Sequence, residues 1–364
     1  MTYKVIRNLC FLLFLERWLI MSKKKYLLSI LLFLFLTFGT YYFVFKDYSF
    51  SLFLSSLSYC NPLFIVISFV SMFFWAFFEA LYLKVMCFYM GYKISYYKAF
   101  GYVFTECYFS AITPSSIGGQ PVQMAEMSHD GIPYRVSSVI ILLNTLIYKI
   151  ALIIIATIGI ILFKDILFSF NTLFNWLVLL GFITTILLII CFLVLVYSKK
   201  LMYYIVKLVI CVLNKLHIFK SIKEKENKLN ASLKDYQECA LLTKRKPSIL
   251  IISLIILLCQ RLSILAVSYF IYKSFGLNDN SIYFIIAMQS CITLGSDFMP
   301  FPGGVVVAEG LLFEANKIIY GSNLATPAMI LLRTISFYSI VIFSLLFYIY
   351  FHFKKRNKSE VIGG

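Results

Sequence analysis

Helix-length apolar runs dominate this sequence of 364 residues and decide what it can fold into. Six of them are long enough to cross the roughly 30 Å hydrocarbon core of a bilayer: residues 26–45, 62–83, 136–163, 172–197, 248–272 and 325–352. The chain is 61% hydrophobic and only 13% charged, which is more apolar surface than a water-soluble domain can bury. The sequence therefore predicts an all-α fold, a polytopic integral membrane helical bundle.

Two short helix-breaking motifs interrupt the apolar sequence and look like copies of each other. The first covers residues 114–121 (PSSIGGQP) and is followed by Glu126; the second covers residues 300–304 (PFPGG) and is followed by Glu309. An apolar stretch, 95–113 or 281–299, runs directly into each motif. Duplicated breaks with nearby charges are typical of transporter cores that bind their substrate near the bilayer midplane.

The distribution of lysine and arginine predicts how the chain is threaded. Basic clusters at 23–25, 198–247 and 354–356 are expected in the cytoplasm, and with them both termini. Segment 84–135 then begins and ends inside, and segment 273–324 begins and ends outside. Each is expected to be a hairpin of two short helices or a re-entrant loop, entering from opposite faces.

This threading predicts two inverted repeats, each with three spans and one broken hairpin. The alternative is two ordinary extra helix pairs whose Gly-Gly turns agree by coincidence. We expect the first repeat at 26–163, the second at 164–352, a cytoplasmic N-terminal extension at 1–25 and a cytoplasmic tail at 353–364. Within the second repeat, residues 198–247 are expected to include a basic amphipathic helix on the cytoplasmic leaflet.

Composition also argues against several functions. The net charge of +17 lies in loops beside apolar segments, which favours contact with anionic lipid at the cytoplasmic face over nucleic acid. Nine scattered cysteines and three isolated histidines show no metal-ligand spacing, so we expect no metal and no cofactor. Neither a nucleophile-base arrangement nor a nucleotide-binding fingerprint is recognisable, so no catalytic residue is predicted.

Charges inside the apolar runs are the candidate site residues, because a charge at membrane depth is costly unless it is paired or hydrated. In one interpretation, Glu126 forms an ion pair with Lys149 and Glu309 forms one with Arg333, so that each half is stabilised by an internal ion pair. In the other, the cations hold a lipid phosphate and the carboxylates receive the headgroup. The helix amides freed by the two breaks would add to a phosphate site. The full candidate set is Glu126, Lys149, Glu309, Arg333, Gly118, Gly119, Gly303, Gly304, Asp297, Glu79 and Arg261.

The two motifs, with Asp130-Gly131-Ile132 and Arg333, resemble the lysylphosphatidylglycerol synthase transmembrane-region family over roughly residues 25–352. This family includes the flippase half of the bacterial multiple peptide resistance factor. The resemblance implies movement of phosphatidylglycerol or its aminoacylated form between leaflets of a bacterial cytoplasmic membrane. The chain stops at Gly364, so it resembles stand-alone members, and the transferase activity in the family name is not carried over.

The sequence thus predicts a flippase-like translocator of a membrane phospholipid. Two alternatives stay open: a lysyltransferase-type lipid-modifying protein that acts with a separate soluble synthase, and a non-transporting scaffold for envelope synthesis. A homo-oligomer also remains open.

Overall fold

The computed structural model describes residues 57–58, 60–113, 118–168, 172–198, 246–297, 313 and 315–362, and it contains helices but no strand in these ranges. Several predicted features lie outside the described residues: the extension at 1–25, the span at 26–45, most of the amphipathic segment at 198–247, and the second motif with Gly303, Gly304 and Glu309.

Five helical stretches are long and apolar enough to cross a membrane: Pro62–Tyr89, Tyr134–Asp165, Phe174–Val194, Pro247–Ser274 and Ala325–Phe351. They match five of the six predicted spans and confirm an all-α membrane fold. Their outer faces carry exposed apolar side chains; on the third span, Trp176 and Leu187 are 58% and 59% exposed. In a bilayer these faces would lie against lipid.

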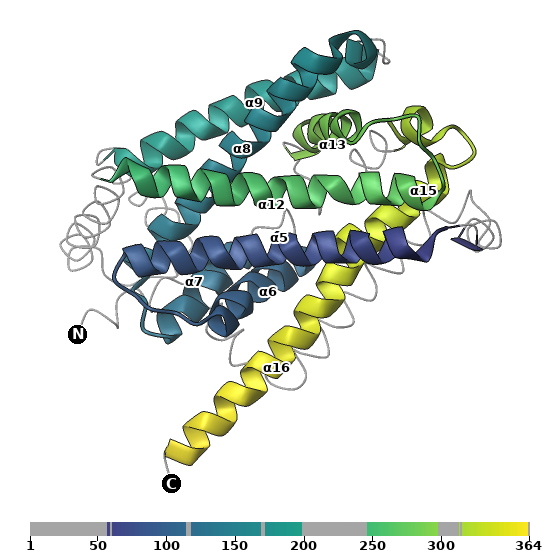
Figure 1. Cartoon of the computed structure of the whole chain (residues 1–364). Helices are drawn as coiled ribbons and strands as arrows, with labels where there is room; N and C mark the ends of the chain where they lie inside the picture. Colours follow the sequence, from purple (N-terminus) through teal and green to yellow (C-terminus); the bar gives the residue numbers. More distant parts are fainter. Residues whose placement is uncertain are drawn as a thin grey trace, which may run out of the picture.

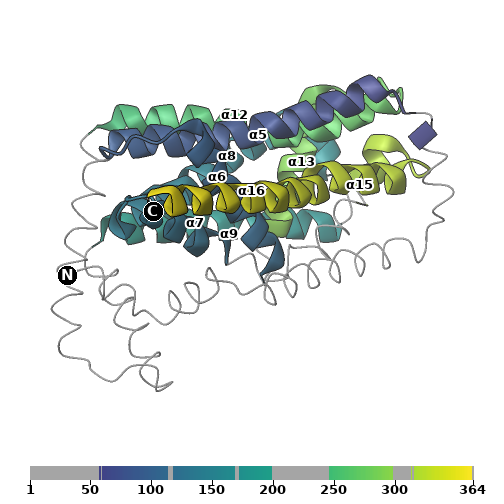
Figure 2. The ribbon, with the colours of Figure 1, turned by 90° about the horizontal axis from the view of Figure 1, so that it is seen from below.

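Helices α5 (Pro62–Tyr89) and α12 (Pro247–Ser274) lie side by side and antiparallel along their whole length (Figures 1 and 2). At one end the Asn61 N–H donates to the Ser274 carbonyl at 2.7 Å, and farther along the Ser71 hydroxyl donates to the Ser263 carbonyl at 2.6 Å. Because the two helices are antiparallel, they end on opposite sides of the bundle.

The segment after α5 is a hairpin of α6 (Tyr96–Ile112) and α7 (Gly119–His129). Asp130 joins the end of α7 to the start of α6. It accepts a hydrogen bond from the Tyr102 hydroxyl at 2.8 Å and forms an ion pair with Lys98 at 3.5 Å. With 11 residues, α7 is only about 16 Å long and too short to cross a bilayer. This hairpin therefore returns to the side from which it started, as predicted.

The Gly-Gly pair lies where α7 begins, in close contact with α6. The Gly118 N–H donates to the Thr113 hydroxyl at 3.0 Å, so this amide is already used within the turn. A Cβ atom on Gly119 would lie 2.1 Å from Ser110 Oγ and 2.5 Å from the Glu106 carbonyl oxygen. Only glycine permits so close an approach of α7 to α6.

The segment after α12 starts with α13 (Ile282–Asp297), which enters the bundle from the opposite end to α6. It packs against α8 (Tyr134–Phe168), α9 (Thr172–Tyr197) and α12. A Cβ on Gly159 of α8 would lie 2.6 Å from Ala287 Cβ, and one on Gly181 of α9 would lie 2.1 Å from the Leu294 carbonyl oxygen. These close crossings hold α13 against both α8 and α9.

The last span is one long rod with a local irregularity. Helix α15 (Ala325–Arg333) continues through a π-helical turn (Thr334–Tyr338) into α16 (Ser339–Ile362). The rod crosses α5 obliquely in Figure 1, and α16 packs against α6.

The close crossing at Gly181 gives a first testable expectation. Gly181→Ala should lower the melting temperature of the detergent-purified protein, because the added methyl group meets backbone that has no rotamer with which to move away. Overpacking of this kind costs about 1–3 kcal/mol. Leu187→Ala, at an outward-facing position of the same helix, is the control and should leave the melting temperature nearly unchanged. Equal melting of the two variants would contradict the described crossing.

Candidate functional site

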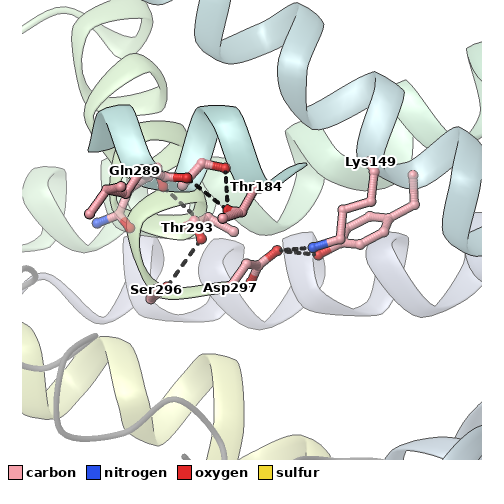
Figure 3. A network of polar contacts seen from close by, with 9 residues as sticks. Lys149, Thr184, Gln289, Thr293, Ser296 and Asp297 are labelled. Carbon is pink, nitrogen blue, oxygen red and sulfur yellow. Dashed lines mark hydrogen bonds and ion pairs between the residues drawn. The ribbon is translucent and has the colours of Figure 1, made fainter. Parts of the chain in front are cut away.

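An ion pair joins the two halves of the bundle near the middle of α8. Lys149 Nζ lies 2.7 Å from Asp297 Oδ2 at the end of α13, and the Tyr148 hydroxyl donates to the same oxygen at 2.9 Å (Figure 3). Lys149 is 8% exposed, so its charge is largely removed from solvent. This contact corrects the expected Glu126–Lys149 pair: the lysine is paired with a carboxylate from the other half, 148 residues away.

A second cation, Arg261, lies close to the ring of Tyr148. The guanidinium carbon of Arg261, at the middle of α12, is 3.5 Å from the centroid of the Tyr148 ring, and Lys149 Nζ is 5.1 Å from it. Arg261 Nε is buried without a hydrogen-bond acceptor, and the described part of the chain places no carboxylate within ion-pair distance of this arginine. An aromatic face stabilises a cation only partly.

A partly buried carboxylate, Glu79, interacts electrostatically with one of these cations, Arg261. On α5, one carboxylate oxygen of Glu79 accepts a hydrogen bond from the Asn144 amide of α8, and the other accepts from the Gln260 amide of α12 at 3.2 Å. Both oxygens therefore have neutral donors. Arg261 interacts with Glu79 electrostatically but forms no ion pair with it.

Glu106 of α6 is the other carboxylate in this region. Its Oε1 accepts from the Ser110 hydroxyl at 2.8 Å, one turn along the same helix, and it interacts electrostatically with Glu79. Neither Glu79 nor Glu106 therefore forms the ion pair that Arg261 lacks. We call Tyr148, Lys149, Arg261 and Asp297 the cationic cluster, and Glu79, Asn144 and Gln260 the amide cluster.

Most of the other polar groups of α13 bond within the helix, while the Gln289 amide donates to the Ser268 hydroxyl of α12 at 3.0 Å. Thr293 donates to the Gln289 carbonyl at 2.8 Å and Ser296 donates to the Thr293 carbonyl at 3.2 Å, while Thr184 of α9 donates to carbonyls of its own helix (Figure 3). Among the described residues of α13, Asp297 is the one whose side chain bonds to α8.

The structure thus brings together four of the predicted site residues: Lys149, Asp297, Glu79 and Arg261. Glu126 lies buried on α7, and Arg333 ends α15 just before the π-helical turn. Gly118 and Gly119 lie at the start of α7, against α6.

Three residues of this site were not predicted: Tyr148, Asn144 and Gln260. Each is a neutral polar side chain within an otherwise apolar span, and a search for charges alone does not find it. The useful signal was position, because Tyr148 directly precedes Lys149, Gln260 directly precedes Arg261, and Asn144 lies one helical turn before Tyr148.

Comparison with known families agrees with this membrane architecture. The model of the family described as "Lysylphosphatidylglycerol synthase TM region" matches residues 25–344, which is most of the chain. The chain belongs to this family. No curated protein matches the sequence. Membership in the lysylphosphatidylglycerol synthase TM region family confirms the resemblance stated from the sequence and marks the chain as a lipid-related membrane protein.

The buried ion pair can be tested through stability. Asp297→Asn should destabilise the purified protein by about 3–5 kcal/mol, because it leaves the Lys149 charge buried without its partner. Adding Lys149→Met to this variant should recover part of the loss. Both changes would be followed by thermal unfolding in detergent.

Lys98→Met serves as the matched control for this ion pair. It breaks the Lys98–Asp130 pair at a side chain that is 42% exposed, where an ion pair contributes only about 0–1 kcal/mol. If the two single substitutions had equal effects, Lys149 and Asp297 would not form a buried pair.

Proposed function

We propose that this protein is a flippase-like translocator that moves a phospholipid, such as phosphatidylglycerol or an aminoacylated derivative, between the leaflets of a bacterial cytoplasmic membrane. The cationic cluster would bind the phosphate of the headgroup while the acyl chains stay in the bilayer. The proposal agrees with membership in a lipid-related membrane family.

One observation carries this proposal: Arg261 lies at the middle of a membrane-length helix without an ion-pair partner among the described residues. A guanidinium group has five N–H donors and matches a phosphate through paired hydrogen bonds. Its neighbouring carboxylates are already bound, Asp297 by Lys149 and Glu79 by two amides. A phosphate is the acceptor that this arginine lacks.

Lys149 would supply the second contact to the same phosphate. Its ammonium group and the Arg261 guanidinium lie on one aromatic ring, so a single anion can approach both. Removing a phosphate from water is prohibitive without compensating charges, and fixed cations replace the lost hydration. Asp297 would compete with the phosphate for Lys149, which leaves the empty cationic cluster with one net positive charge and makes phosphate binding reversible.

We further propose that the two halves form inverted repeats around this site. The same spacing of 185 residues separates Pro62 from Pro247 and the positive-φ Gly91 from Gly276, and it separates Gly118 from Gly303 in the two motifs. The antiparallel α5–α12 pair fits a twofold axis in the membrane plane. The same axis would relate the packing of α6 on α16 to the packing of α13 on α8. Alternating exposure of the site would follow from such symmetry.

Cytoplasmic basic segments, with both termini on the same side, would gather anionic phospholipid near the entrance. A second copy of the chain or a separate synthase remains a candidate partner under this proposal, because a translocator needs a source of substrate lipid on one leaflet.

Transport in liposomes tests the proposal. The purified full chain, reconstituted with tail-labelled fluorescent phosphatidylglycerol, should make the inner-leaflet label accessible to an external quencher. Arg261→Gln should slow this exchange at least about tenfold, equivalent to about 1.4 kcal/mol of lost binding to the moving lipid.

Lys273→Gln is the control, because this lysine lies at the far end of the same helix and is bonded to Asn278. It should exchange lipid at the wild-type rate. No exchange by the folded wild-type protein, or equal exchange by the Arg261→Gln variant, would refute the proposed role of the cationic cluster.

A further inference from the structure

The amide cluster contains two oxygen atoms that lack a donor. Because the amide nitrogens of Asn144 and Gln260 both donate to Glu79, turning either amide would set its oxygen against a carboxylate oxygen. The orientations are therefore fixed by Glu79. Asn144 Oδ1 and Gln260 Oε1 are then left buried and without a hydrogen-bond donor in the part of the chain that the structure describes.

Such atoms are unusual in a folded protein. A buried acceptor that has lost its water and found no donor costs about 1–3 kcal/mol, and most buried polar groups are satisfied. Gln260 is only 2% exposed, and both unsatisfied oxygens flank the same carboxylate. The cluster is therefore rich in acceptors and short of donors, which is the opposite of the cationic cluster beside it.

The two clusters lie in register along the same helices. Asn144 precedes Tyr148 by one turn of α8, and Gln260 directly precedes Arg261 on α12. One turn of helix rises 5.4 Å. A single headgroup can therefore reach from the cationic cluster to the amide cluster.

We infer that Glu79, Asn144 and Gln260 bind the hydrogen-bond donors that follow the phosphate in the lipid headgroup, either hydroxyl or ammonium groups. This inference rests on the proposed function and narrows its substrate class. The favoured lipids are phosphodiesters whose headgroup ends in hydroxyl or ammonium donors. A phosphodiester lipid of the same charge without such donors binds the cationic cluster but leaves the amide oxygens unsatisfied.

The test compares three tail-labelled lipids in liposomes that contain the full chain. Phosphatidylglycerol offers hydroxyl donors, phosphatidylethanolamine offers an ammonium group, and phosphatidylmethanol has the phosphodiester but no donor beyond it. The wild-type protein should move at least one of the first two about tenfold or more faster than phosphatidylmethanol, because a site with buried polar groups rejects a ligand that leaves them unpaired.

Asn144→Leu and Gln260→Met each remove one unsatisfied oxygen, together with the amide that donates to Glu79, at similar side-chain volume. We expect both variants to move every lipid at about the wild-type rate for phosphatidylmethanol, so that the headgroup preference disappears. The phosphatidylmethanol rate shows within each sample that the variant is folded. Thr184→Val, which removes a hydroxyl bonded only within α9, should keep the preference. Glu79→Gln is the second test if the amide variants cannot be purified.

The outcomes separate this inference from the proposed function. If the folded wild-type protein moves none of the three lipids, the proposed function itself fails. If it moves all three at one rate, and the variants do the same, only this inference is overturned. If the variants move all three lipids equally slowly, including phosphatidylmethanol, then the amide cluster binds a cation or stabilises the helix packing. The inference is again overturned.

Discussion

The cost of placing charge inside a membrane is the constraint on which this structure depends. Lys149 and Asp297 meet that cost together, and their contact fixes where α13 ends, near the middle of α8. Because the two residues come from different halves of the chain, the pair also holds the halves in register. The charge of Arg261 is stabilised by the ring of Tyr148, without an ion pair among the described residues. This incomplete stabilisation is the physical basis of the proposed phosphate site.

Close helix contacts make such a charge arrangement possible. Gly119, Gly159 and Gly181 let α7, α8 and α9 approach their partners at distances that no side chain would allow. In lipid, helices associate through tight packing of small residues, because burying an apolar helix face against another helix gives no hydrophobic gain over burying it in lipid. Gly159 and Gly181 thus hold α13, which carries Asp297, in close contact with α8 and α9.

The spans could be predicted because the length and polarity of an apolar run reflect the thickness of a bilayer. Five of the six expected spans are present, and the sixth lies outside the described residues. The hairpin at 96–129 was also foreseen from its helix breakers. Partners could not be predicted in the same way: the Lys149–Asp297 pair spans 148 residues, and its choice over Glu126 depends on how α13 packs. Asn144 and Gln260 were missed because neutral amides do not stand out in a search for buried charge.

The most direct measurement is a cryo-EM structure of the full chain in nanodiscs that contain phosphatidylglycerol. The account predicts headgroup density between the halves, with the phosphate in contact with Arg261 and Lys149 and the glycerol directed toward Asn144 and Gln260. Lipid density confined to the outer faces of α5, α9 and α12, with Arg261 bound instead by a carboxylate of the chain, would contradict it.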